Sequence, residues 1–145
     1  MRSPSKKIII DSGFLVALFN EEDRLHVKAK EVAEQITHFE WNTTSFVIQE
    51  IFWLLSTRKN FSVALVFFQQ VKTLLVLPNL PWDWPDQIAK ILRQYASAEI
   101  DLADASLVVL ADLLKTERVV SVDRKDFSIL RWNSNKNTFH NLMDD

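Results

Sequence analysis

The segment Lys7-Ile8-Ile9-Ile10-Asp11 carries the clearest structural signal in this sequence. A short β-branched run that ends at an acid is typical of a buried parallel strand, and its carboxyl end falls at Asp11. Arg118–Val122 shows the same pattern and is followed by another acid, Asp123. Ligands of parallel α/β sheets bind beyond the carboxyl ends of the strands. Both acids are therefore expected at a functional edge of the protein.

Helical patterns separate these strands along the chain. We expect a turn at Ser12 and Gly13, and N-caps at Asp23 and Ser45. Pro85 marks a first helical turn. The expected helices are Phe14–Phe19, a helix after Asp23, Phe46–Thr57, Phe61–Lys72, a helix after Pro85, Asp101–Lys115 and Asp126–Leu130; the expected additional strands are Phe39–Thr43 and Leu74–Leu77. This alternation predicts an α/β sandwich with a mainly parallel sheet.

The composition excludes several classes of function. Gly13 is the single glycine, where average usage would give about ten. The sequence therefore contains neither a G-x-G-x-x-G turn nor a glycine-rich phosphate-binding loop, and no nucleotide cofactor is expected. The absence of cysteine excludes thiolate nucleophiles and fits a reducing cytoplasm. The net charge of -2 argues against a nonspecific nucleic-acid coat protein.

The length of 145 residues suffices for a single domain, 1–145, that needs no disulfide or metal for its core. We expect this core to run from Lys7 to about Leu130, and residues 133–145 are only loosely patterned. The most apolar stretch, residues 61–77, contains polar side chains and falls short of a membrane span. A soluble, cytoplasmic protein is expected.

Two further acids lie on apolar helix faces. Glu50 has apolar residues at all positions three and four away, and Asp104 has Ile100, Leu107 and Val108 at such positions; no lysine or arginine occupies any of them. A buried carboxylate is tolerated only when it is paired, hydrogen-bonded or coordinated to a metal. Glu50 and Asp104 are therefore the most informative candidate site residues in the chain.

Four motifs of this sequence together resemble the PIN domain, and in particular the toxin nucleases of the VapBC toxin–antitoxin type. The motifs are I-I-I-D11-S-G-F-L-V-A-L-F, S-F-V-I-Q-E50-I-F-W-L-L, D101-L-A-D104-A-S-L-V-V-L-A-D and V-V-S-V-D123-R-K-D126-F. Their acids are 39, 54 and 19 residues apart. The resemblance implies a three-layer sandwich and a metal-dependent ribonuclease whose catalytic and metal-binding acids are Asp11, Glu50, Asp104 and Asp123, with Asp101 as an auxiliary ligand.

The chemistry of these acids supports a metal site. Four carboxylates that converge without counter-charge would repel one another, and one or two divalent cations would make the cluster tenable. Oxygen ligands without a histidine or cysteine set favour Mg²⁺ or Mn²⁺ over zinc. The hydroxyls of Ser12 and Ser121 could support a carboxylate or phosphate oxygen, although the family often has threonine at the position of Ser121. Arg124 and Lys125, directly after Asp123, are the best-placed phosphate contacts.

Simpler structural roles compete with these functional ones. Asp11 could cap the first helix, and Asp123 could be a turn residue. Asp101 is better explained as an N-cap than as a ligand, and Asp126 is explained in the same way. Gly13, two residues after Asp11, is expected to provide a backbone conformation or a close approach that alanine would disturb.

Several functions remain open at this point. The leading hypothesis is a toxin endoribonuclease that binds RNA, is held inactive by a small cognate antitoxin and forms a homodimer through surplus aromatic residues on the 46–68 helices. A PIN-fold RNA-binding or RNA-processing protein that is not a toxin, or a structure-specific DNase, is the alternative. A phospho-acceptor receiver domain fits poorly, because its middle strand, Leu74–Leu77, ends at Pro78 rather than at an aspartate.

Overall fold

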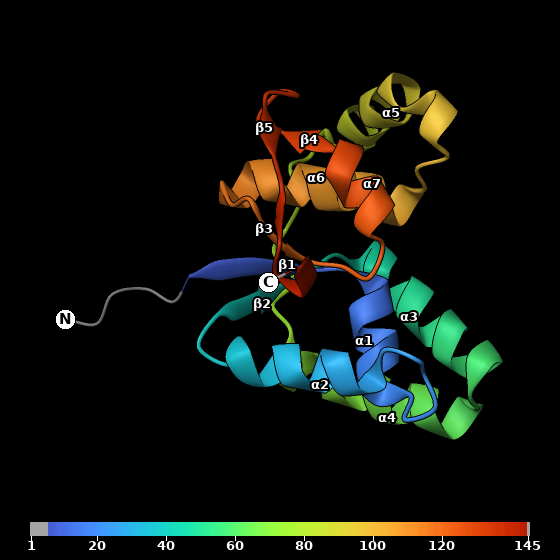
Figure 1. Ribbon diagram of the computed structural model, residues 1–145. Coiled ribbons are helices and arrows are strands. Elements are labelled where there is room, and N and C mark those ends of the chain that lie inside the picture. The colour runs from blue at the N-terminus through green and yellow to red at the C-terminus, as the bar shows by residue number, and fades with distance from the viewer. Residues whose placement is uncertain (1–5, 145) are drawn as a thin grey trace.

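A four-stranded sheet forms the centre of the molecule in the computed structural model, which describes residues 6–144 (Figure 1). The strand order is β2-β1-β3-β6, and every neighbouring pair is parallel. The strands are β1 (Lys7–Ile10), β2 (Glu40–Asn42), β3 (Arg118–Val120) and β6 (His140–Asn141). The expected parallel central sheet is thus confirmed.

Helices cover both faces of this sheet. Figure 1 shows α1, α2 and α4 on one side of the sheet and α5 and α6 on the other. The helices are α1 (Ser12–Phe19), α2 (His26–Gln35), α3 (Ser45–Arg58), α4 (Phe61–Leu74), α5 (Trp84–Gln94), α6 (Leu102–Leu114) and α7 (Arg124–Ile129), with 3-10 turns at Ala96–Ala98 and Leu142–Asp144. The architecture is therefore the expected three-layer α/β sandwich.

The β1 strand is buried from both sides. Ile8, Ile9 and Ile10 are wholly inaccessible to solvent, as are Phe14 on α1 and Leu107 on α6. Complete burial of an aliphatic or aromatic side chain of this size contributes about 1.5–3 kcal/mol. The uninterrupted apolar run of β1 is thus explained by its place between two neighbouring strands and two helical layers.

The chain passes from β1 into α1 without a separate turn. The predicted turn at Ser12 and Gly13 is wrong, because both residues already belong to α1. Asp11 has an extended backbone and is the N-cap of this helix, and its carboxylate accepts a hydrogen bond from the Ser12 backbone N–H at 2.7 Å. An acid at the end of the strand therefore also lies at the N-terminus of a helix, where negative charge is favoured.

Two other predicted helix N-caps are wrong, one by one residue and the other by two. Thr44, not Ser45, caps α3, and its hydroxyl accepts from the Val47 N–H at 3.4 Å. The Asp23 carboxylate accepts from the Leu25 N–H at 2.8 Å in a turn before α2, so it does not cap that helix. At α3 a neighbouring hydroxyl was an equally good cap, whereas α2 begins after Leu25 without a side-chain cap.

The predicted strand at Leu74–Leu77 does not form. Helix α4 continues through Leu74, and Val76 makes only an isolated bridge to Asn42 beside β2. Pro78 follows immediately, and a proline lacks the N–H that a further ladder bond requires. The receiver-domain alternative, which needs a strand at this place, loses its middle strand altogether.

The segment after Leu130 has little sequence pattern, yet it contributes to the sheet and to the core. A hairpin of β4 (Arg131–Trp132) and β5 (Asn137–Thr138) leads into β6 at the sheet edge, and Met143 is buried. Within residues 6–144, no helix has the length and apolar character needed to cross a bilayer.

Candidate functional site

Asp11 lies at the centre of the site. Its side chain is buried, and its two carboxylate oxygens accept from the Ser12 N–H at 2.7 Å and from the Ser121 hydroxyl at 2.8 Å. Burial raises the pKa of Asp11 from 3.8 to about 6; the two hydrogen bonds oppose this rise, and the charges of Glu50 and Asp101 add to it. Asp11 is thus a desolvated carboxylate that lies close to other acids.

Glu50 reaches Asp11 through Ser12. The Ser12 hydroxyl donates to Glu50 Oε1 at 2.6 Å and lies 3.5 Å from Asp11 Oδ1. Burial raises the pKa of Glu50; the Ser12 hydrogen bond opposes this rise, and the charge of Asp101 adds to it. The structure therefore places Ser12 between the two acids, which is the supporting position expected from the sequence.

Asp101 and Asp104 are joined at the start of α6. The Asp101 carboxylate accepts from the Asp104 N–H at 2.8 Å, and the Asp104 carboxylate accepts from the Asp101 N–H at 3.4 Å, which is a capping box. Asp101 is therefore an N-cap, as expected. The pKa of Asp104 is raised to about 9, mainly by burial and further by the charges of Asp11 and Asp101. Asp104 is the most strongly perturbed of the candidate ligands.

Asp123 lies three residues beyond β3, in a loop that Ser121 organises. The Asp123 N–H donates to the Ser121 hydroxyl at 3.0 Å, and the Asp123 carboxylate accepts from the Asp126 N–H at 3.1 Å. Asp123 thus caps α7, and the prediction that Asp126 starts this helix is wrong by two residues. β3 ends at Val120, two residues before the predicted strand end at Val122, and the helix that follows also begins two residues earlier than predicted.

Asp126 is an acid of the site that the sequence reasoning missed. Its pKa is raised to about 6, mainly by burial. A hydrogen bond with Asp123 and the charges of Asp123, Asp101 and Asp11 also contribute to this rise. The sequence pattern predicts only a capping role for Asp126. Its position three residues after Asp123 in the first turn of α7 puts the two carboxyl groups on one side of the helix. That spacing was the signal available in the sequence.

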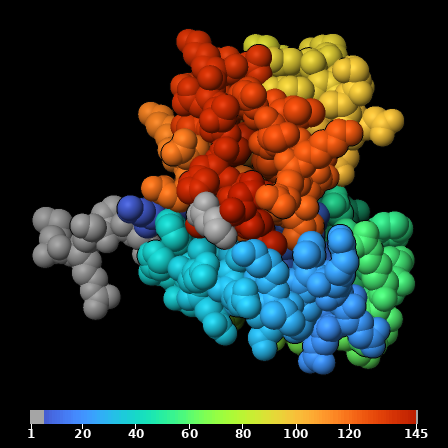
Figure 2. Space-filling model, viewed as in Figure 1, coloured from blue at the N-terminus to red at the C-terminus, as the bar shows by residue number. Residues whose placement is uncertain are grey.

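The structure thus gathers acids from β1, α3, α6 and α7 at the carboxyl edge of the sheet. Figure 2 shows the surface indented where the upper, orange part of the molecule meets the lower, green part. Within residues 6–144, no three acidic, histidine or cysteine side chains have the spacing that would hold one ion. The side chains are therefore a group of mutually repelling acids and not a formed coordination shell. Their all-oxygen donor set fits a hard divalent cation.

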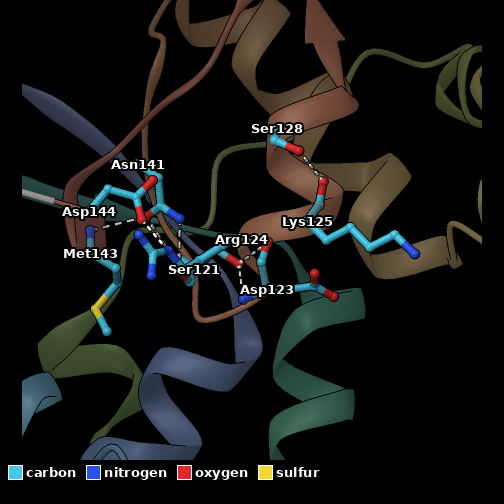
Figure 3. Close-up of polar contacts among 8 residues, drawn as sticks. All are labelled: Ser121, Asp123, Arg124, Lys125, Ser128, Asn141, Met143 and Asp144. Carbon is cyan, nitrogen blue, oxygen red and sulfur yellow. Dashed lines mark hydrogen bonds and ion pairs between the residues drawn. The ribbon is translucent and has the colours of Figure 1, made fainter.

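The two predicted phosphate contacts differ in their surroundings. The Arg124 guanidinium forms an ion pair with Asp144 from the C-terminal turn (Figure 3). Lys125 lies next to it in α7, and Figure 3 shows its side chain extending away from the Arg124 pair and from Ser121. Both side chains are exposed, but among residues 6–144 only Arg124 of the two forms an ion pair.

Gly13 provides space and not an unusual backbone conformation. Within the described residues no glycine has a positive φ, and a Cβ added at Gly13 would lie 2.1 Å from Val122 Cγ2. Gly13→Ala is expected to destabilise the protein by about 1–3 kcal/mol through this overlap. Urea unfolding checks this value. The double variant Gly13→Ala/Val122→Ala should recover part of the loss, and no recovery would show that the overlap is not the cause.

This protein has a parallel sheet, and carboxylates from several helices lie at the carboxyl edge of its strands. It therefore belongs to the class of α/β proteins with an acidic site at the sheet edge. The chain belongs to the PIN domain family, whose family model matches residues 8–132. The match runs from Ile8 in β1 to the end of β4 and includes all the acids of the candidate site.

The chain is similar to one curated protein and to one solved structure. It is 29% identical over 125 residues to a curated protein of Mycobacterium tuberculosis, Ribonuclease VapC26, and the alignment covers 86% of this chain and 92% of the relative. The crystal structure of Mycobacterium tuberculosis VapC20, described as a sarcin–ricin loop cleaving toxin, superposes with a TM-score of 0.74 at 21% identity. That match covers 83% of this chain and 92% of the other. This structural likeness confirms the fold.

Proposed function

We propose that this protein is a Mg²⁺- or Mn²⁺-dependent endoribonuclease and the toxin of a toxin–antitoxin pair that acts in the cytoplasm. The observation that carries the proposal is the arrangement of acids at the sheet edge of a PIN-family chain: Asp11 and Glu50 lie on either side of the Ser12 hydroxyl, and Asp101 and Asp104 form one capping box. The similarity to a relative named a ribonuclease supports the choice of reaction.

The residues that would hold the cation are Asp11, Asp104, Asp123, Glu50 and Asp101. When bound, a divalent ion lowers the pKa of water and stabilises the negative charge that develops in phosphodiester hydrolysis. The chain itself orients the acids: Ser121 donates to Asp11, and Ser12 donates to Glu50. No side chain needs to act as a nucleophile in this reaction.

The direct test is cleavage of labelled RNA by the purified protein. We expect cleavage with Mg²⁺ or Mn²⁺ and none in excess EDTA, and we expect single-stranded DNA of the same sequence to remain intact. Cleavage that persists in EDTA would contradict metal dependence. Cleavage of the DNA instead of the RNA would favour the DNase alternative.

Lys125 is expected to contact the substrate phosphates more strongly than Arg124, because Arg124 is already paired with Asp144. Lys125→Ala should weaken RNA binding. It should also reduce, by about 1, the magnitude of the slope of the logarithm of the association constant for RNA against the logarithm of the salt concentration. Arg124→Ala is the matched control and should reduce the slope less. Equal slopes for the two variants would show that the ion pair does not withhold Arg124 from RNA.

A protein partner is expected on the α3–α4 face. Trp53, Phe61 and Phe68 are each more than half exposed there, and soluble monomers rarely expose several large apolar side chains together. We propose that this face contributes to a homodimer or to binding of a small antitoxin. Light scattering of the purified chain tests the dimer, and a monomer at micromolar concentration would leave the antitoxin as the occupant to be sought by co-expression with the neighbouring reading frame.

A further inference from the structure

Asn141 on the edge strand β6 binds the backbone of Ser121 from both sides. Its Oδ1 accepts from the Ser121 N–H at 3.1 Å, and its Nδ2 donates to the Ser121 carbonyl at 2.8 Å (Figure 3). Oδ1 also accepts from the Met143 N–H at 3.1 Å. The Asn141 side chain is buried, so these three hydrogen bonds use most of its polar capacity.

This contact continues the sheet where the backbone ladder stops. β3 ends at Val120, whose carbonyl accepts from the Asp11 N–H at 3.0 Å, and Val119 is the last β3 residue that pairs with β6. The Asn141 amide then takes the place of a further strand residue beside Ser121. The direction of the Ser121 side chain is therefore set by an element close to the C-terminus.

The Ser121 hydroxyl is placed between two candidate ligands. It accepts from the Asp123 N–H at 3.0 Å and donates its one proton to Asp11 Oδ2 at 2.8 Å. A rotation of the Ser121 peptide would break both contacts together. A buried amide with satisfied hydrogen bonds is common in proteins, but here the segment it holds is the one that joins Asp11 to Asp123.

We propose that Asn141 is a positioning residue of the acidic site, which acts on Asp11 and Asp123 through Ser121. This inference rests on the proposed function, because the acids it positions are the proposed metal ligands. Outer partners of metal ligands typically change metal affinity by about 10- to 100-fold. Loss of Asn141 should therefore weaken cation binding and not only fold stability.

The experiment compares Mn²⁺ affinity, by calorimetry, with thermal stability for Asn141→Leu and a matched control. Thr116→Val is the control, because the buried Thr116 hydroxyl donates to the Lys7 carbonyl at 3.0 Å and accepts from the Arg118 N–H at 3.2 Å, at the opposite end of β1 and β3. Both variants should melt at lower temperature than the wild type. Asn141→Leu alone should bind Mn²⁺ about tenfold more weakly.

A double-variant cycle tests whether Asn141 acts through Ser121. If it does, Asn141→Leu/Ser121→Ala should bind Mn²⁺ no more weakly than Ser121→Ala alone. Asn141→Asp is a second variant in case the leucine variant does not fold, because it keeps the acceptor for Met143 and removes the donor to the Ser121 carbonyl. Wild-type affinity in either Asn141 variant, or losses that add in the double variant, would overturn the inference.

Failure of the proposed function has a different signature. If the wild-type protein does not bind Mn²⁺, the proposed metal site is contradicted. Crystal structures of the wild type and of Asn141→Asp then test the positioning role. We expect the 2.8 Å contact between Ser121 Oγ and Asp11 Oδ2 to be lost in Asn141→Asp. Its persistence in that variant would overturn the positioning role independently of any metal.

Discussion

Replacement of Asp104 by asparagine is expected to abolish RNA cleavage and at the same time to stabilise the metal-free protein. Asp104 is the proposed ligand with the largest perturbation, because burial and the charges of Asp11 and Asp101 raise its pKa to about 9. An asparagine has nearly the same shape, can still accept the Asp101 N–H, and carries no charge. Removing a partner outside the ligand shell already costs about 10- to 100-fold, so loss of a ligand should cost at least about 100-fold in cleavage rate.

The stabilising half of this prediction follows from proton linkage. Near pH 8 the folded wild type must keep Asp104 protonated, whereas the unfolded chain releases that proton, which favours unfolding. Asparagine removes this difference. The gain in melting temperature of Asp104→Asn over the wild type should therefore be small at pH 5 and increase toward pH 8.

Asp112→Asn is the matched control for both measurements. Asp112 lies two turns further along the same helix, and burial raises its pKa as well. It accepts from the backbone N–H of Asn133, which an asparagine can also do. Cleavage by Asp112→Asn should equal that of the wild type. Wild-type cleavage by Asp104→Asn would remove Asp104 from the site.

The stability of the metal-free wild type is expected to fall steadily as the pH rises from about 4 to 9, and Mn²⁺ is expected to reverse this fall. The pKa values of Asp11 and Asp126 are raised to about 6, that of Asp104 to about 9, and that of Glu50 is raised too. Groups with a raised folded pKa retain protons that the unfolded chain has lost, so the free energy of unfolding decreases as pH increases through this window.

The size of the effect can be judged from Asp11 alone. A pKa of about 6 in place of 3.8, for a side chain that is almost completely buried, corresponds to about 3 kcal/mol of stability lost by pH 8. A bound divalent cation favours the ionised carboxylates and binds only the folded chain, so its stabilisation should be larger at pH 8 than at pH 5.

Urea unfolding at pH 5, 6, 7 and 8, each with EDTA and with Mn²⁺, measures this dependence. Equal ionic strength keeps general charge screening constant across the series. In EDTA the curve should become flatter in Asp104→Asn, because one of the titrating acids has been removed. A wild-type stability that increases between pH 5 and 8 in EDTA would contradict the raised pKa values.

Much of the fold and the centre of the site could be predicted from local patterns. The apolar run of β1 placed Asp11 at a strand end, and the apolar neighbours of Glu50 and Asp104 marked carboxylates directed toward the core. The helix starts were less predictable. Asp11 caps α1, as one interpretation of the sequence allowed, whereas Thr44 and Asp123 cap helices whose starts were predicted at Ser45 and Asp126.

What the sequence by itself determined was the parallel α/β architecture, and it singled out the candidate acids, since strand and helix periodicity and unpaired charges are local properties. Only the tertiary structure could decide that Asp126 faces the same cluster, that Arg124 pairs with Asp144, and that Asn141 holds Ser121. These contacts join residues whose strands, helices and turns come together only through the packing of the sheet. Their energies depend on burial and orientation, which one-dimensional spacing does not contain.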